Sequence, residues 1–212
     1  MKIPVLDSQP QWVAEHVEGL NFLEQERQRK ELEAQLPGIT RVFKDLIGQL
    51  PSPNLSDVTE FPVAACVVKK GDNGLVEVVS TAANATNRRS DSTAHAELEA
   101  IKAAEDVTGT KHLEGQFLLT TLEPCTMCCG AAVNADLAGV VYGTRHDDVE
   151  NTHALVGGQF KPYRTSPESF NADDYLTDSG LIVVGSFMRT ETLDAIHRTP
   201  VSIADYYRDP DA

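Results

Sequence analysis

The sequence has no hydrophobic run near the length of a membrane span, which takes about 18 to 20 consecutive apolar residues. Its first seven residues do not form a signal peptide, because their apolar stretch is short and an acidic residue follows it. Repeats and low-complexity tracts are missing too. We therefore expect a soluble, cytoplasmic protein without a membrane partner, whose 212 residues form one domain with an appendage or at most two small domains.

Cysteine is scarce, and its few positions are clustered. Only four cysteines occur, and three of them, Cys125, Cys128 and Cys129, fall within five consecutive positions. This spacing does not suit a disulfide framework. It indicates metal or redox chemistry in a reducing compartment.

Basic residues are few in comparison with acidic ones. The chain has 18 Lys and Arg against 32 Asp and Glu, for a formal net charge of −14. Contacts between basic side chains and phosphates dominate nucleic-acid affinity. The balance therefore argues against a nucleic-acid partner and favours a small neutral substrate, although solubility alone also accounts for an acidic surface.

Two short motifs carry the chemistry that the chain does contain. One is a His-x-Glu motif with His95 and Glu97, and the other is a Pro-Cys-x-x-Cys motif with Cys125 and Cys128. One imidazole and two thiolates form the ligand set of a catalytic zinc, whose fourth position stays open for water. We predict that His95, Cys125 and Cys128 bind one Zn²⁺ per chain. Glu97, which is not a ligand, is then placed to move protons between that water and a substrate.

The remaining cysteines and histidines do not fit this ligand set. Cys129 points about 100° away from Cys128 around a helix, so we interpret it as a core or near-site thiol. Cys66 sits in an apolar strand and is interpreted as packing. Five further histidines lack ligand spacing and are predicted to be surface or satisfied side chains: His16, His112, His146, His153 and His197. Of these, His146 and His153 lie in the loop that we expect to border the pocket.

Strand and helix patterns alternate along most of the chain. Apolar runs predict strands at residues 62–68, 75–81, 117–122, 139–143 and 181–185. Helices are predicted from about 93 to 108, from 124 to about 137 and at 190–197, with polar or irregular segments at 84–91 and 145–179. This alternation predicts a three-layer α/β/α architecture.

The first fifty residues look helical and carry no recognisable chemistry. An amphipathic pattern runs from residue 11 to 36, and Pro37-Gly38 is predicted to stop it. A second apolar pattern spans 39–50, and residues 51–56 then have the composition of a linker. We expect this extension to pack on the core or on a partner subunit.

Residues around both motifs resemble the zinc-dependent cytidine/nucleobase deaminase superfamily. Residues 91–101 (DSTAHAELEAI) and 121–128 (TLEPCTMC) carry the resemblance. Within the superfamily, the chain particularly resembles the branch of guanine deaminases, tRNA adenosine deaminases and fungal-type cytosine deaminase. It implies a cytidine-deaminase-like α/β/α fold with a five-stranded mixed sheet. It also implies a homodimer with the active site near the subunit contact.

The resemblance implies a division of the chain into three parts. A helical N-terminal extension would span residues 1–55, the zinc deaminase domain 56–200, and a C-terminal tail that could cover the active site 201–212.

Further substrate-binding residues follow from the same resemblance. In this family an Asn eleven residues before the ligand His bonds the base, which corresponds to Asn84, with Asn87 as the alternative. Related enzymes close their sites with C-terminal aromatic side chains, a role that Tyr206 and Tyr207 could take.

Residues 144–150 are similar to the corresponding segment of guanine deaminases. An acidic side chain there could accept the N1–H and 2-amino hydrogens of guanine, and the candidates are Asp147, Asp148 and Glu150.

The predicted function is hydrolytic deamination of a free nucleobase or related aminated heterocycle, with a guanine-type purine favoured. A zinc-bound hydroxide would attack the amine-bearing carbon, Glu97 would shuttle protons, and ammonia would leave. Three alternatives remain open: a cytosine or nucleoside deaminase, a tRNA adenosine deaminase, and a catalytically idle partner subunit. The idle reading is disfavoured because Glu97 and all three predicted ligands are intact.

Overall fold

A mixed sheet of five strands runs through the protein and determines where the helices pack. The strands are β1 (Ala64–Lys70), β2 (Val76–Ala83), β3 (Phe117–Leu122), β4 (Gly139–Thr144) and β5 (Ile182–Val184), in the order β2-β1-β3-β4-β5. Strand β1 is antiparallel to β2 and β3, whereas β3, β4 and β5 are parallel to one another. The structure is a computed structural model that describes residues 22–50, 60–72, 75–153 and 170–198.

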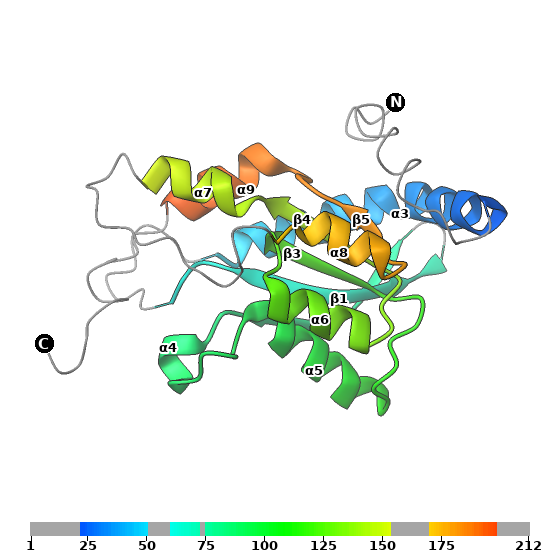
Figure 1. The fold of residues 1–212 in the computed structure, drawn as a ribbon, viewed down its shortest axis with the longest axis horizontal. Helices are drawn as coiled ribbons and strands as arrows, with labels where there is room; N and C mark the ends of the chain where they lie inside the picture. Colours follow the sequence, from blue (N-terminus) through cyan, green and yellow to red (C-terminus); the bar gives the residue numbers. More distant parts are fainter. Residues whose placement is uncertain (1–21, 51–59, 73–74, 154–169, 199–212) are drawn as a thin grey trace, which may run out of the picture.

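Helices cover both faces of this sheet. On one side lie α5 (Ala96–Thr108) and α6 (Thr126–Asn134), and on the other lie α3 (Phe22–Gly48), α7 (His146–His153) and α9 (Arg189–Arg198) (Figure 1). Helix α8 (Ala172–Asp178) packs beside α6 and β5, and the short α4 (Thr86–Arg89) lies between β2 and α5 in the chain. The three-layer α/β/α fold with a five-stranded mixed sheet is therefore confirmed.

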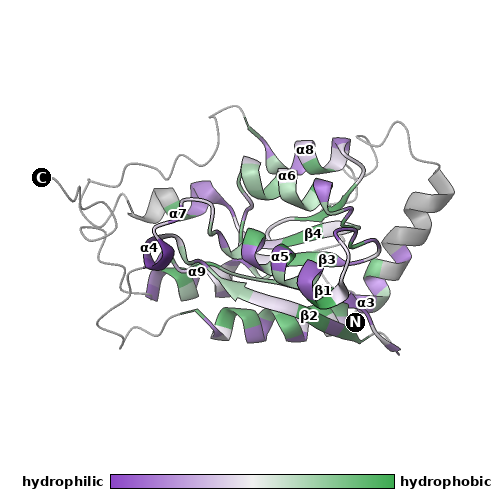
Figure 2. Cartoon of the chain, turned by 90° about the horizontal axis from the view of Figure 1, so that it is seen from below, coloured by the Kyte–Doolittle hydropathy of each residue, from purple (hydrophilic) through white to green (hydrophobic). Residues whose placement is uncertain are grey.

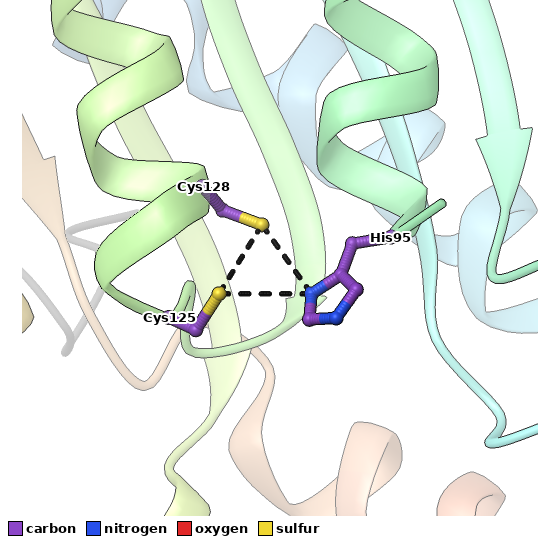
Figure 3. A group of neighbouring side chains, drawn as sticks. All are labelled: His95, Cys125 and Cys128. Carbon is purple, nitrogen blue, oxygen red and sulfur yellow. Dashed lines mark hydrogen bonds between the residues drawn. The ribbon is translucent and has the colours of Figure 1, made fainter. Parts of the chain in front are cut away.

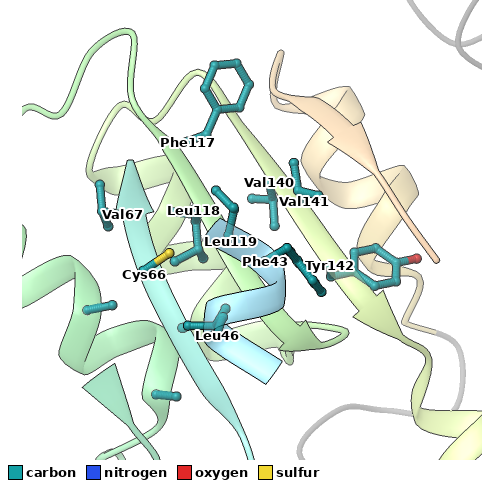
Figure 4. Close-up of a cluster of buried hydrophobic side chains, with 14 of the residues drawn as sticks. Phe43, Leu46, Cys66, Val67, Phe117, Leu118, Leu119, Val140, Val141 and Tyr142 are labelled. Atoms are coloured by element: carbon teal, nitrogen blue, oxygen red, sulfur yellow. The ribbon is translucent and has the colours of Figure 1, made fainter. Parts of the chain in front are cut away.

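The core is densest around the two central strands. Every residue of β3 and β4 is buried, because helices cover both faces of the sheet there. Figure 4 shows buried side chains of both strands, among them Leu119 and Val141, in one hydrophobic cluster with Phe43 and Leu46, which α3 contributes. The hydropathy colours of Figure 2 mark hydrophobic residues along the strands, whereas α4 is coloured as strongly hydrophilic. Continuous apolar runs in the sequence thus mark strands that are buried on both faces.

The expectation that Pro37-Gly38 ends a helix is wrong. A single helix, α3, continues through Pro37 to Gly48. An interior proline costs about 3 kcal/mol, but a row of buried side chains keeps the same phase on both sides of it, and each contributes about 1.5–3 kcal/mol. The row consists of Leu32, Leu36, Ile39, Phe43 and Leu46. Neither α3 nor any other helix in the described ranges is long and apolar enough to cross a membrane.

Two segments predicted to be irregular contain helices. The polar stretch 84–91 includes α4, and the stretch 145–179 includes α7 and α8. The side chain of Asn171 caps α8 by accepting a hydrogen bond from the N–H of Asp174 at 3.2 Å, a local signal that the composition of the segment hides. The predicted linker at residues 51–56 and the tail at 201–212 lie outside the described residues. The domain boundaries stay predictions.

Helix α3 anchors on the sheet through Phe43. This fully buried side chain packs edge-to-face against Phe187, with ring centroids 5.3 Å apart. Phe43→Ala should lower the free energy of unfolding by about 3 to 5 kcal/mol, because it removes a large apolar group and leaves a cavity. Chemical denaturation measures the change. The exposed neighbour Lys44 provides the matched control, since Lys44→Ala should change stability by less than about 0.5 kcal/mol. Equal effects of the two substitutions would contradict this role of α3.

Candidate metal centre and active site

One edge of the sheet gathers the chemically interesting side chains. Because β1 runs antiparallel to its neighbours, its beginning lies at the same edge as the ends of β2, β3 and β4. Ligands of open α/β sheets bind outside the carboxyl ends of the strands. A pocket at this edge is lined by Phe61, Val63, Asn84, His95, Glu97, Leu122, Glu123, Cys125 and His146.

Three buried side chains form a triangle of metal-binding atoms beside the pocket. The sulfurs of Cys125 and Cys128 lie 3.5 Å apart, and each lies 3.6 Å from Nδ1 of His95 (Figure 3). In a tetrahedral site with Zn–S bonds of about 2.3 Å and Zn–N bonds of about 2.1 Å, neighbouring ligand atoms lie about 3.6 to 3.8 Å apart. The spacing and the donor set therefore fit a zinc ion, and the three residues could hold one.

The beginnings of two neighbouring helices create this triangle. His95 is the N-cap residue of α5 and Cys125 is the N-cap residue of α6, both with extended backbone angles. Pro124 precedes this N-cap residue and lies outside α6, so its missing N–H removes no helical hydrogen bond. The partial positive charge at a helix N-terminus favours thiolates. The hydrogen bond with Cys128 and the nearby His95 also lower the pKa of Cys125.

Glu97 lies in the first turn of α5, close to the triangle but outside it. Its side chain is buried and lines the pocket together with His95. Burial raises the pKa of Glu97 to about 7, with a further contribution from the charge of Cys125. The structure therefore places a carboxyl group with a raised pKa beside the candidate metal centre, where the sequence predicts a proton shuttle.

Asn84 also faces this pocket, directly after the end of β2. It is buried, and its backbone N–H donates to the carbonyl of Val63 at 3.0 Å, which fixes it against the beginning of β1. The alternative residue, Asn87, is exposed on α4. The arrangement favours Asn84 of the two, and its contact with a base stays a prediction.

The predicted acidic and aromatic contacts are not gathered in the same way. Asp147 is exposed at the start of α7. The carboxylate of Asp148 accepts two hydrogen bonds from the guanidinium of Arg189, at 2.5 and 2.8 Å. This ion pair lowers the pKa of Asp148. Glu150 belongs to α7. The two tyrosines of the tail lie outside the described residues, so substrate roles for this group stay predictions.

His146 lies beside the pocket, as expected for the loop that carries it, although the sequence reasoning assigned it no role there. It was expected to be a surface or satisfied histidine, but it lines the pocket, and its Nε2 is buried without a hydrogen-bond partner among the described residues. Its backbone N–H donates to Oε2 of Glu123 at 3.2 Å, and burial lowers its pKa, which keeps the ring neutral. Helix α7 begins at this residue, directly beyond β4, so the side chain meets the pocket. No ligand spacing in the sequence indicates this position.

A network of polar side chains, in which Tyr142 and Asp173 are buried and Arg145 is partly exposed, holds the carboxyl end of β4. Tyr142 donates a hydrogen bond to Asp173 at 2.8 Å, and Arg145 reaches the same carboxylate at 2.5 Å. Arg145 also lies 3.9 Å from the carboxylate of Glu123, which borders the pocket. The network links α8 to the segment that carries His146 and so stabilises this side of the pocket.

The other two cysteines lie away from the metal-binding triangle. Cys129 is buried, and its thiol donates to the carbonyl of Pro124 at 3.5 Å. Cys66 is buried in β1, and burial raises the pKa of its thiol to about 12. Both positions agree with the interpretation of these residues as packing.

Comparison with known proteins places this site in a family. Residues 52–144 match the family of the cytidine and deoxycytidylate deaminase zinc-binding region. The tRNA-specific adenosine deaminase of Aquifex aeolicus is 45% identical over 83 residues, which cover 39% of this chain and 52% of that protein. The guanine deaminase of Bacillus subtilis is 37% identical over 87 residues, which cover 41% of this chain and 53% of that protein. The chain thus spans about half the length of these two relatives.

A solved structure supports the same assignment at the level of the fold. The guanine deaminase from Nitrosomonas europaea superposes with a TM-score of 0.54 at 23% identity, covering 89% of this chain and 91% of that one. The matched segment of the sequence contains both motifs and every residue of the metal-binding triangle. Residues 52–144, which hold the metal-binding triangle, thus match the cytidine and deoxycytidylate deaminase zinc-binding region.

Proposed function

We propose that this protein is a zinc-dependent hydrolase that deaminates a free nucleobase or a related aminated heterocycle, with a guanine-type purine favoured. The observation that carries the proposal is the pocket in which Glu97 and Asn84 lie beside the three metal-binding atoms of His95, Cys125 and Cys128. A proton shuttle, a base-binding amide and a metal centre are the parts that such a reaction requires.

The reaction replaces an amine by an oxygen. A zinc ion held by the triangle would lower the pKa of a bound water to about 7 and so supply a nucleophile at neutral pH. Glu97 takes a proton from the water and passes it to the ring nitrogen next to the attacked carbon. The carbon–oxygen bond forms, the carbon–nitrogen bond breaks after Glu97 helps to protonate the amine, and ammonia leaves. Asn84 holds the ring in position.

The lining of the pocket supports a small neutral substrate. No lysine or arginine is among the described residues that line the pocket, and the chain as a whole carries a net charge of −14. A polynucleotide needs cations that neutralise its phosphates. His146 adds a ring whose pKa burial lowers and whose Nε2 has no hydrogen-bond partner within the described ranges, which suits a hydrogen bond to a polar edge of a heterocycle.

A second candidate function is deamination of adenosine in tRNA. The specific observation in its favour is the higher identity to the tRNA-specific adenosine deaminase of Aquifex aeolicus, 45% against 37% for the guanine deaminase of Bacillus subtilis. The exposed Arg88 and Arg89 on α4 are cations near this edge of the sheet, although Arg89 already pairs with Glu99.

Ammonia release from a substrate panel tests the proposal. The panel contains guanine, guanosine, adenine, adenosine, cytosine, cytidine, ammeline and a tRNA anticodon hairpin, and zinc is measured on the same sample. Turnover of one free base, guanine first, is the expected result, whereas turnover of the hairpin alone would support the second candidate. Bound zinc without any turnover would favour an idle partner subunit. Light scattering of this sample tests the predicted homodimer.

Glu97→Gln should retain zinc and lose turnover. The substitution preserves the shape of a side chain that is not a ligand, but an amide cannot take a proton from water and pass it on. We expect kcat to fall by about 100-fold or more, with zinc content equal to that of the wild type. Loss of zinc from this variant would show that Glu97 helps to hold the metal instead.

Cys125→Ala should release the metal and destabilise the fold, because zinc binding contributes to folding when the ligands come from separate elements. The adjacent thiol of Cys129 offers a matched control, since Cys129→Ala removes a buried sulfur that lies outside the triangle. We expect zinc loss and a lower Tm for the first variant, and one zinc per chain for the second. A Cys125→Ala protein that keeps its zinc would rule out this ligand assignment.

A further inference from the structure

A single carboxylate beside the pocket accepts four hydrogen bonds. Glu60 lies shortly before β1, and its donors are the N–H groups of Asn87 at 3.2 Å and Arg88 at 2.6 Å, the hydroxyl of Thr86 at 3.3 Å and the side-chain amide of Asn84 at 3.3 Å. Two of these bonds cap the first turn of α4. The other two reach toward the pocket, so Glu60 joins the loop after β2 to the beginning of β1.

These bonds determine which way the Asn84 amide points. An ionised carboxylate only accepts, so the group of Asn84 that faces Glu60 must be the NH₂. Thr86 has one hydroxyl proton and donates it to Glu60, so its oxygen accepts the second amide hydrogen of Asn84, at 3.2 Å. A flipped amide would place its oxygen against the carboxylate of Glu60, which has no proton to donate. The chemistry of the three groups therefore fixes the amide orientation and leaves the carbonyl oxygen Oδ1 for the pocket.

The backbone around Asn84 is held as firmly as its side chain. Its N–H donates to Val63, and the N–H of Ala85 donates to the carbonyl of Ala94, the residue before His95, at 2.9 Å. The amide thus has a fixed place relative to the metal-binding triangle. Glu60 sets the remaining variable, which is the rotation of the side-chain amide.

We propose that Glu60 is a positioning residue that makes Asn84 a hydrogen-bond acceptor toward the substrate. The pocket then selects a heterocycle with an N–H group at this point. A free base carries ring N–H groups. A nucleoside lacks one of them, because that ring nitrogen forms the glycosidic bond. The proposal rests on the proposed function for its substrate, whereas the amide orientation does not depend on turnover.

An exchange of donor and acceptor tests the pair kinetically. Asn84→Asp sets two carboxylates against each other and should lower kcat/KM by about 10-fold or more, since a buried acceptor loses its donor. In Glu60→Gln with Asn84→Asp, the new amide at position 60 can donate to the new carboxylate, which still offers an oxygen to the pocket. We expect this double variant to recover part of the loss, because the amide nitrogen that replaces Oε2 no longer accepts from the N–H of Asn87. Losses that simply multiply would overturn the proposal.

A matched control separates positioning from general support of α4. Glu99 pairs with Arg89 of the same short helix and has no hydrogen bond to Asn84. Glu99→Gln should therefore leave kcat/KM unchanged, and Glu60→Ala should lower it by about 10-fold. In an Asn84→Ala background, Glu60→Ala should have no further effect on kcat/KM. An equal loss in that background would show that Glu60 acts only on stability.

Hydrogen exchange of the Asn84 side-chain amide tests the orientation without any substrate. The NH₂ signals of Asn84 are identified as those that disappear in Asn84→Asp. In the zinc-loaded wild type these amide hydrogens should exchange more slowly than those of exposed amides, and Glu60→Ala should speed their exchange. Fast exchange in the wild type would overturn the proposal even if a base is turned over. If no base is turned over, the proposed function fails, and the exchange measurement still decides the role of Glu60.

Discussion

The direction of β1 is the constraint on which the site depends. Because β1 is antiparallel to both of its neighbours, the segment that enters it lies at the edge where β2, β3 and β4 end. Glu60, Asn84, Cys125 and His146 come from four different segments, and each follows or precedes a strand at this edge. A parallel β1 would carry Glu60 to the opposite edge and separate it from Asn84.

Electrostatics reinforce this geometry. Two helices begin side by side, so their N-terminal partial charges converge where two thiols and a carboxylate are buried. Three acidic groups without such compensation would repel one another in a poorly solvated pocket. The helix ends and His95 supply positive charge from fixed positions, and a metal ion would add more. The same burial raises the pKa of Glu97, which lies next to these groups.

The sequence predicted those parts of the site that depend on local patterns. The spacing of Cys125 and Cys128 and the His-x-Glu motif identified the metal-binding triangle, and buried strands were visible as apolar runs. It could not predict that α3 continues through Pro37, because packing against a distant sheet outweighs the local cost of proline. It placed the loop of His146 beside the pocket but assigned this side chain no role, and it gave no sign of Glu60, whose partners come from residues far away in the chain.

Helix α3 and helix α9 have a consequence for how this family is handled in the laboratory. The family match covers residues 52–144, yet α3 and α9 lie outside that segment and cover one whole face of its sheet. A recombinant fragment cut at the family boundaries would expose the apolar face that Phe43 and Leu46 now shield. Contiguous apolar surface of this kind drives self-association. In this chain, the matched segment therefore depends on helices outside it to cover its sheet.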